Sequence, residues 1–415
     1  MPGDSKFIKK LWIIGFYSIA IILGVINGLW GNAFSLEFAD ILSQIFIRLF
    51  KFIAVPIIGV SVIVTIASLG ANSRNRIIWK RALFYTLTTT VAAATVAAVL
   101  YTFFSPEIVS LKAEENIADT IASKGTYIDN LISAVPDNIL QPLLEGKVLA
   151  VLCIALAVGI AINRIQNQEV RNTISNFFAA LQQILFTFVK WLINILPLGI
   201  FGFISACFVE FKSGVNLGGL GTYFVTIISA NLVQMFIILP LFLLFKGLNP
   251  LLVAKGMFKA LMVAFFSKSS AATLPVTMQC AEEKCQVRPL VSRFVLPICT
   301  TINMNGCAAF ILITVIYLMQ NAGIEISFTT LLAWVFIATV AAIGNAGVPM
   351  GCFFLSASLL SSMDVSILLM GIILPFYNVI DMLETSLNVW SDSCVANMVN
   401  KDVGNQLDVQ KVDKV

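Results

Sequence analysis

The sequence predicts an all-α integral membrane protein with eight transmembrane helices and two re-entrant helical hairpins. Of its 415 residues, 59% are hydrophobic and only 12% are charged, and the mean hydropathy is +0.93. A soluble domain is about one-quarter charged and covers its apolar core with polar side chains, so lipid is the expected solvent for most of this chain. Its apolar runs approach the ~20 residues that a membrane helix needs, and they lack the alternation over ~10 residues that is typical of barrel strands.

Basic residues gather at alternate links between the apolar segments. They lie in the tail at 1–10 and near 74–81, 164–171 and 246–259, and the positive-inside rule places these links in the cytoplasm. Both termini are therefore expected inside and the acidic-leaning stretch 105–146 outside. The first apolar run is too long for a signal-peptide core and is expected to be retained. The predicted membrane helices are 11–30, 39–70 (bent at Pro56), 82–104, 147–165, 174–208, 218–246, 289–319 and 367–399.

Two further apolar segments, 250–285 and 326–366, are broken in the middle. The first contains Ser267–Pro275 and has basic residues on both flanks, so a hairpin entered from the cytoplasm is expected. The second contains Gly344–Gly351 and lacks basic flanks, so a hairpin entered from outside is expected. The seventh helix is also interrupted, at Thr300–Gly306. Non-helical backbone at membrane depth is tolerated only inside protein or beside water, and paired interruptions of this kind point to the binding site of a transporter.

The last predicted helix carries a polar stripe. Asp381, Glu384, Asn388 and Asp392 are spaced by 3, 4 and 4 residues, so at about 100° per residue they share one narrow face. Intramembrane carboxylates are costly unless they meet a partner, an ion or water. The interrupted seventh helix offers carbonyl oxygens for a small cation, and hairpin tips offer orphan N–H groups for a carboxylate. With a free aspartate for an ammonium, these groups predict a site for an amino acid and a coupling ion.

Composition disfavours other classes of function. The chain has no histidine, which removes imidazole ligands, bases and proton relays, so an enzyme has little support and no cofactor is expected. The net charge of +4 does not suggest a nucleic-acid partner. The eight cysteines lie mostly in apolar segments without a CxxC pair and are expected to be core residues, not a disulfide or metal framework. An ion channel stays open as an alternative because broken helices also build selectivity filters.

Four motifs occur in order along the chain: Ser267–Pro275, Thr301–Gly306, Gly347–Gly351 and Asp381–Asp392. With them the sequence resembles the dicarboxylate/amino acid:cation symporter family, whose fold is that of the glutamate transporters. The resemblance covers nearly the whole chain. It implies a homotrimer of independently working protomers in the plasma (inner) membrane, in which each protomer takes up an amino acid together with sodium by an elevator mechanism.

The resemblance also implies a division of the chain into a static scaffold and a mobile transport unit. The scaffold would comprise 11–81 and 147–210, the transport unit 82–104 and 211–399, the extracellular loop 105–146, and the cytoplasmic tails 1–10 and 400–415. The polar composition of Lys401–Val415 predicts that the second tail is disordered.

Binding residues of the family match positions of this sequence one by one. Asp381 matches the aspartate that holds the substrate's α-ammonium, and Asn388 matches an asparagine that contacts both substrate and sodium. The substrate site implied in this way comprises Ser269, Ser270, Cys307, Gly347, Val348, Pro349, Asp381, Glu384, Thr385 and Asn388. The implied sodium sites comprise Tyr85, Thr88, Thr89, Cys299, Thr301, Asn303, Met304, Asn305, Ala342, Ile343, Asn345, Asn388 and Asp392.

Two positions depart from the family pattern. Glu384 stands where acidic-substrate members have an arginine for the substrate's side-chain carboxylate, so a small neutral amino acid is the expected substrate. Lys268 could pair with Glu384 or supply a substitute cation, which keeps glutamate, aspartate or a C4-dicarboxylate as the alternative. Asn305 replaces an aspartate of the family motif, which predicts fewer coupled sodium ions. A proton on Glu384 is the other candidate coupling ion, because a carboxyl in a low-dielectric site can titrate near neutrality.

Overall fold

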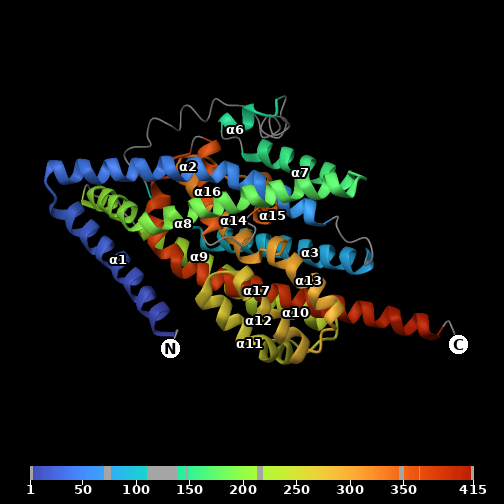
Figure 1. The fold of residues 1–415 in the computed structure, drawn as a ribbon. Helices are drawn as coiled ribbons and strands as arrows, with labels where there is room; N and C mark the ends of the chain where they lie inside the picture. The colour runs from blue at the N-terminus through green and yellow to red at the C-terminus, as the bar shows by residue number, and fades with distance from the viewer. Residues whose placement is uncertain are drawn as a thin grey trace.

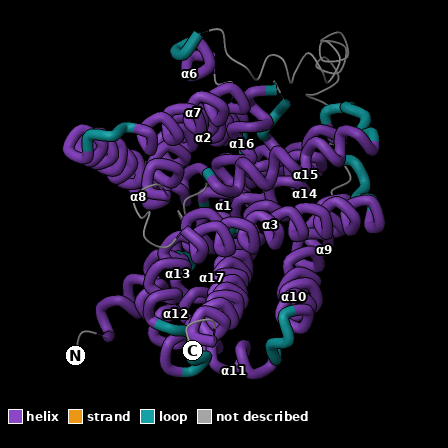
Figure 2. Tube along the Cα trace, turned by 90° about the vertical axis from the view of Figure 1, so that its right-hand side faces the viewer, coloured by secondary structure: helices purple, strands orange, loops and turns teal. Residues whose placement is uncertain are grey.

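The structure, a computed structural model of the 415-residue chain, describes residues 3–69, 76–109, 138–145, 148–212, 218–344, 350–363 and 365–412. All regular secondary structure in these ranges is helical, in agreement with the predicted all-α class (Figure 1). The helices pack into one bundle in which segments from both ends of the chain lie side by side (Figure 2).

Four helices from the first half of the chain pack mainly against one another. The long α8 contacts both α1 and α2, and α2 also contacts α7. Gly202 permits one of these close approaches, because a Cβ at this position of α8 would lie 2.7 Å from the backbone oxygen of Ala39 on α2. These helices are α1 (Gly3–Trp30), α2 (Ala33–Leu69), α7 (Val148–Arg164) and α8 (Gln168–Lys212), and the short α6 (Gln141–Glu145) precedes α7.

The remaining helices surround α14, which is the centre of the core. From Asn305 to Met319 every residue of α14 is buried, as expected for a helix that is apolar on all sides. It contacts α3, α9, α15, α16 and α17. The bounds are α3 (Arg76–Phe104), α9 (Gly218–Val233), the π-helical turn Gln234–Ile238, α10 (Leu239–Phe245), α11 (Pro250–Ser267), α12 (Ser270–Glu283), α13 (Pro289–Ile302), α14 (Asn305–Asn321), α15 (Phe328–Ile343), α16 (Gly351–Ser362) and α17 (Leu368–Val412).

Each predicted interruption separates two helices. Lys268 ends α11 in the left-handed region at φ 53°, and Ser269 caps α12 by accepting a hydrogen bond from the amide of Ala272 at 3.2 Å. α13 ends at Ile302 with Asn303 as its C-cap, and α14 begins at Asn305 with Met304 as its N-cap. In the second broken segment Met350, at φ 60°, directly precedes α16. α11 and α12 pack against each other, and α15 and α16 both pack on α14.

Several helices have the length and composition of membrane spans. Within the described part of the chain five qualify, and shorter apolar helices occur in α1, α7, α8, α15 and α16. Large apolar side chains such as Phe16, Ile22, Trp191 and Phe236 lie exposed on the outer helices, which is the pattern of a surface solvated by lipid. The five spans are Ile77–Phe104, Gly219–Phe245, Pro250–Ser267, Pro289–Asn321 and Leu368–Gly404.

The prediction of a disordered C-terminal tail is wrong for residues 401–412, and residues 413–415 lie outside those that the structure describes. α17 continues to Val412 and projects beyond the bundle (Figure 1). Asp402 anchors this extension, because it accepts a hydrogen bond from Lys246 at 3.0 Å and from the hydroxyl of Tyr85, and its carboxylate lies 3.6 Å from Arg81. Residues 401–412 contain no proline, so the helix can propagate past this anchor. The N-terminal tail is likewise part of a helix, since α1 begins at Gly3.

Candidate functional site

The polar stripe of α17 lies inside the bundle. The side chains of Asp381, Glu384, Asn388 and Asp392 are at most 5% exposed. α17 packs against both arms of the first broken segment, both halves of the interrupted α13–α14 pair, and α16. The spacing predicted from the sequence therefore directs the carboxylates toward the helix interruptions.

Glu384 occupies a closely packed position against α14. The hydroxyl of Tyr377 donates a hydrogen bond to its Oε2 at 3.2 Å, while its Oε1 is buried without a hydrogen-bond partner. A Cβ on Gly306 would lie 2.8 Å from the Cα of Glu384 and 2.9 Å from its Cβ, so only glycine fits there. One carboxylate oxygen is thus held by tyrosine and the other is ready to accept a hydrogen bond or bind a cation.

Asp381 lies one turn before Glu384 and interacts electrostatically with it and with Lys268. Its Oδ2 is also buried without a hydrogen-bond partner. Lys268, at the tip between α11 and α12, donates a hydrogen bond to Asn378 Oδ1 at 3.0 Å. The lysine therefore approaches the aspartate that the sequence assigns to the substrate's ammonium.

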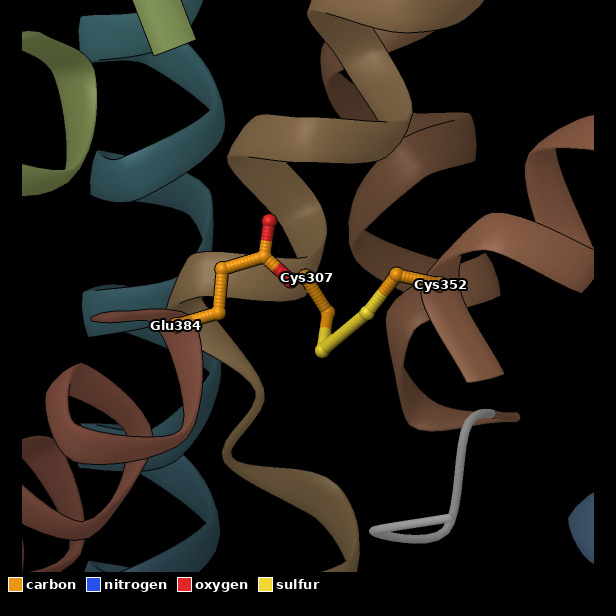
Figure 3. Close-up of side chains that lie close together, drawn as sticks. All are labelled: Cys307, Cys352 and Glu384. Carbon is orange, nitrogen blue, oxygen red and sulfur yellow. A yellow bond between two sulfur atoms is a disulfide. The ribbon is translucent and has the colours of Figure 1, made fainter. Parts of the chain in front are cut away.

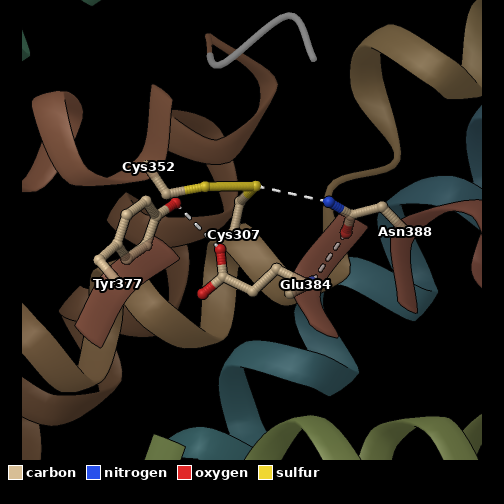
Figure 4. Close-up of a disulfide and its surroundings, with 6 residues drawn as sticks. Cys307, Cys352, Tyr377, Glu384 and Asn388 are labelled. Carbon is tan, nitrogen blue, oxygen red and sulfur yellow. Dashed lines mark hydrogen bonds between the residues drawn. A yellow bond between two sulfur atoms is a disulfide. The ribbon is translucent and has the colours of Figure 1, made fainter. Parts of the chain in front are cut away.

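Asn388 connects α17 to the beginning of α14. Its Oδ1 accepts a hydrogen bond from the amide of Gly306 at 2.9 Å, and its Nδ2 donates to Cys307 Sγ at 3.5 Å (Figure 4). The orphan amide at the start of α14 is satisfied in this way, as the first N–H groups of a helix require.

A chain of buried amides connects α17 to α3. Asn303 Nδ2 donates to Asp392 Oδ1 at 3.0 Å, and Asn303 Oδ1 accepts hydrogen bonds from Thr89 Oγ1 at 3.1 Å and Asn305 Nδ2 at 3.0 Å. Asn305 Oδ1 in turn accepts from Gln234 Nε2 at 2.7 Å. The side-chain oxygen Oδ1 of Asn303 therefore accepts hydrogen bonds from two donors.

Gln234 is a member of this network that sequence reasoning missed. It begins the π-helical turn after α9, is fully buried, and also donates to the backbone oxygen of Thr89 at 3.1 Å. Its amide within an otherwise apolar segment was the available signal, because polar side chains in membrane helices mark functional or packing sites.

The structure contradicts the expectation that the cysteines are only core residues. Cys307, in the first turn of α14, and Cys352, in the first turn of α16, form a disulfide with a Cα–Cα distance of 5.4 Å (Figure 4). They are separated by 45 positions in the sequence and become neighbours because α16 packs on α14. No local spacing motif could have revealed this pair.

The other expected site residues differ in where the structure places them. Thr89 joins Asn303, but the hydroxyl of Tyr85 is directed to Asp402, and Thr88 Oγ1 donates to the backbone oxygen of Phe84 on its own helix. Buried near the interruptions lie Ser270, Cys299, Met304, Ala342 and Thr385, with Ser269, Thr301 and Ile343 partly exposed. Outside the described residues lie Asn345, Gly347, Val348 and Pro349.

The arrangement brings together the groups that a charged small molecule and its counter-ions need. Asp381 and Glu384 each present a buried oxygen without a hydrogen-bond partner, and leaving such an oxygen unsatisfied costs about 1–3 kcal/mol, more when it is charged. Asn303 and Asp392 add hard oxygen atoms suited to a small cation. A ligand that supplies N–H donors or positive charge would satisfy these oxygens.

Similar proteins are known over almost the full length of the chain. The rabbit (Oryctolagus cuniculus) excitatory amino acid transporter 3 is 26% identical, covering 96% of this chain and 87% of the relative. A putative sodium-dependent excitatory amino acid transporter of Caenorhabditis elegans is 27% identical, covering 97% and 92%. The rabbit neutral amino acid transporter B(0) is 26% identical, covering 92% and 78%.

These relatives are named as transporters, some of excitatory and some of neutral amino acids. The family description "Sodium:dicarboxylate symporter family" matches residues 13–402, a range that contains every helix interruption and the whole polar stripe of α17. The resemblance seen in the sequence motifs is confirmed: the chain belongs to the sodium:dicarboxylate symporter family.

Proposed function

We propose that this protein is a cation-coupled symporter that takes up a small neutral amino acid. The observation that carries the proposal is the buried carboxylate of Glu384, with Oε2 held by Tyr377 and Oε1 without a hydrogen-bond partner. A carboxylate in this position repels a second carboxylate and accepts hydrogen bonds from a hydroxyl or an amide. Serine, threonine and glutamine carry such donors on their side chains, whereas ionised glutamate and aspartate do not.

The α-ammonium and the α-carboxylate of the amino acid would be bound by different elements, α17 and the tip between α11 and α12. Asp381 would hold the α-ammonium through its buried Oδ2, which lacks a hydrogen-bond partner. The tip around Ser269 and Ser270, at the beginning of α12, would hold the α-carboxylate with backbone N–H groups. Thr385 and Asn388 lie on the same part of α17 and would complete the substrate site.

Sodium is the coupling ion that the family description supports. One site would use oxygens of Asn303, Asn388 and Asp392; Asn303 is hydrogen-bonded to Asp392, and Asn388 is hydrogen-bonded to the amide that follows the α13–α14 interruption. A second would use backbone carbonyls near Thr301, Met304 and the end of α15. A third, around Thr89 and Asn303, would be weakened because the amide of Asn305 donates to the same Asn303 oxygen that sodium would need.

The organisation of the protein in the membrane is part of the same proposal. It would be a homotrimer in the plasma (inner) membrane with cytoplasmic termini, the scaffold helices remaining static while the transport unit moves. The grouping of α1, α2, α7 and α8 against one another supports a separate scaffold. Cross-linking of the protein in native membranes tests the trimer, and the accessibility of single cysteines at the termini tests the orientation.

Competition in proteoliposomes tests the substrate class. With an inward sodium gradient, uptake of labelled serine should be inhibited by excess serine or glutamine and much less by glutamate. The variant Glu384→Arg should shift this order toward glutamate, while Glu325→Arg, the same charge reversal on an exposed residue outside the site, should leave it unchanged. An unchanged order in Glu384→Arg would refute the selector role of this residue.

A second candidate substrate class has one observation in its favour. Lys268 is near enough to Asp381 to interact electrostatically, and a lysine at the tip could pair with an acidic substrate. Glutamate as the best competitor in the wild-type protein would favour this class.

Uptake that follows an imposed pH gradient without sodium would assign the coupling to a proton, and flux that is linear in concentration would indicate a channel.

A further inference from the structure

Two sulfur atoms and a carboxylate converge where α14, α16 and α17 meet. Cys307 lies on α14, Cys352 on α16 and Glu384 on α17, and all three side chains are at most 2% exposed (Figure 3). One Sγ from each cysteine and one carboxylate oxygen all lie within 4.8 Å of one another. The proposed substrate site already contains Cys307 and Glu384, but no substrate or sodium assignment includes Cys352 or accounts for a second cysteine at this position.

We propose that Cys307, Cys352 and Glu384, with the cysteine pair reduced, form a binding site for a thiophilic divalent cation of the zinc and cadmium type. Zinc binds thiolate at about 2.3 Å and carboxylate at about 2.0–2.2 Å, usually with tetrahedral geometry. Two sulfur ligands of one tetrahedral ion lie about 3.8 Å apart. The two sulfurs, bonded to each other in the oxidised protein, must therefore separate after reduction, while all three ligand atoms already lie within 4.8 Å of one another. Three protein ligands leave the fourth position open.

The surrounding residues fit a cation with sulfur and oxygen ligands. Tyr377 holds Oε2 of Glu384 and so orients the carboxylate, while Oε1 is buried without a hydrogen-bond partner. Asn388 Nδ2 lies 3.5 Å from Cys307 Sγ, where it would donate to a thiolate. Outer contacts of this kind orient ligands and tune metal affinity. Asp381 adds a further negative charge nearby, which favours a divalent cation over a neutral ligand.

The disulfide and the metal site are two states of the same cysteine pair. Thiolates, and not disulfide sulfurs, bind metal. A thiol or phosphine reductant supplies two electrons, two protons are taken up, and the S–S bond is replaced by two thiols. Metal binding then releases the two thiol protons and forms two metal–sulfur bonds. The oxidised protein, with the Cys307–Cys352 bond in place, should therefore have no affinity at this position.

Metal binding to the purified full-length protein tests the proposal without any transport measurement. The protein is reduced with a phosphine, separated from the reductant and titrated with Cd²⁺, while the ultraviolet thiolate-to-cadmium absorption and the bound metal are measured. We expect one additional ion per protomer in the reduced protein compared with the oxidised protein. Cys352→Ser should abolish this ion, and Glu384→Gln should weaken its binding about 10-fold or more.

A matched control separates this site from the other thiols. Cys285→Ser removes a partly buried thiol just after α12, 22 positions before Cys307 in the sequence. This variant should leave the binding of the additional ion unchanged. Thermal unfolding checks that each variant is folded: Cd²⁺ should raise the midpoint of reduced wild-type protein and of Cys285→Ser, but not of Cys352→Ser. Equal binding by Cys352→Ser and wild type would overturn the proposal, whereas a failure of amino-acid uptake would bear only on the proposed function.

Discussion

Replacing Asn305 by aspartate should create a dependence of stability on sodium. In the structure Asn305 is fully buried, and its Nδ2 donates to Asn303 Oδ1 at 3.0 Å and, at 3.5 Å, to the hydroxyls of Thr89 and Thr90. The variant Asn305→Asp turns this donor into an acceptor that faces the carbonyl oxygen of Asn303. Two oxygens at this distance repel each other unless a proton or a cation lies between them.

The expected magnitude follows from these contacts. The lost hydrogen bond costs about 1 kcal/mol, and an uncompensated buried charge costs about 3–5 kcal/mol. Without a cation the free energy of unfolding should fall by about 4–6 kcal/mol, a large part of the ~5–15 kcal/mol that holds a typical domain together. Sodium bound between the two oxygens at 100 times its Kd would restore about 2.7 kcal/mol.

Thermal unfolding with and without sodium, at constant ionic strength set with choline, measures this effect. Asn305→Asp should have a lower midpoint than wild type without sodium and a larger sodium-induced rise. Asn321→Asp is the matched control: Asn321 is also buried, its Nδ2 donates to Tyr317 O at 2.6 Å, and it lies 16 residues further along α14, about 24 Å away.

Asn321→Asp should be destabilised without any added response to sodium. If the sodium-induced rise were the same in Asn305→Asp, Asn321→Asp and wild type, the assignment of a weakened cation site to Asn305 would be refuted. Sodium-dependent uptake gives a second readout, because a restored site should make the dependence of uptake on sodium concentration steeper in Asn305→Asp.

Three further predictions concern packing and charge. Gly306→Ala would place a Cβ 2.8 Å from Glu384 Cα, so uptake should be lost and the unfolding midpoint lowered, whereas Gly221→Ala, with nothing within 4 Å, should stabilise α9 by about 0.5–1 kcal/mol. Asp402→Asn removes the charge that anchors the extension of α17 and should cost about 1.5–3 kcal/mol, measured by thermal unfolding together with proteolysis of the last 10 or so residues. Glu282 accepts hydrogen bonds from the guanidinium of Arg293 and from the hydroxyl of Ser292, both on α13. These bonds hold the pKa of Glu282 below its ordinary value of 4.5. This ion pair therefore stabilises the protein above pH 4.5 and loses its effect as the pH falls through the lower folded pKa, so Glu282→Gln should show a shallower loss of stability below pH 4.5 than wild type.

The helices and their interruptions were predictable because their signals are local. Long apolar runs define the membrane helices, and the breaks are recognised because Ser267–Ser269 and Thr301–Gly306 are clusters of polar residues and glycine within apolar segments. The stripe on α17 was predictable from spacing alone, because helical geometry fixes which residues share a face.

Contacts between distant segments were not predictable in this way. The Cys307–Cys352 bond depends on α16 crossing α14, and the Gln234–Asn305 hydrogen bond depends on the register of a π-helical turn against α14. The extension of α17 depends on Asp402 meeting basic side chains of two other helices. Each depends on a tertiary position for which the local sequence carries no signal.

The balance of charge in the site gives an independent reason to favour a neutral substrate. Among the described residues, Lys268 at the first tip and Asp381, Glu384 and Asp392 on the α17 stripe carry one positive and three negative charges, so their formal sum is −2 when all are ionised. A zwitterionic amino acid adds no net charge, and two monovalent cations, or one cation and a proton, would neutralise the site. An acidic substrate adds −1 and would require a third cation.

In the proposed third cation site the family pattern has a carboxylate at position 305, where this chain has Asn305, whose amide donates to Asn303. The two departures from the family pattern therefore act in the same direction. In the proposed site the negative charge of Glu384 would disfavour an acidic substrate, and the neutral side chain of Asn305 would weaken the binding of an additional cation. Glu384→Arg changes this formal sum from −2 to 0, and adding Asn305→Asp changes it to −1. The double variant should therefore take up glutamate with a steeper dependence on sodium concentration than Glu384→Arg alone, and equal sodium dependence in the two variants would contradict this coupling.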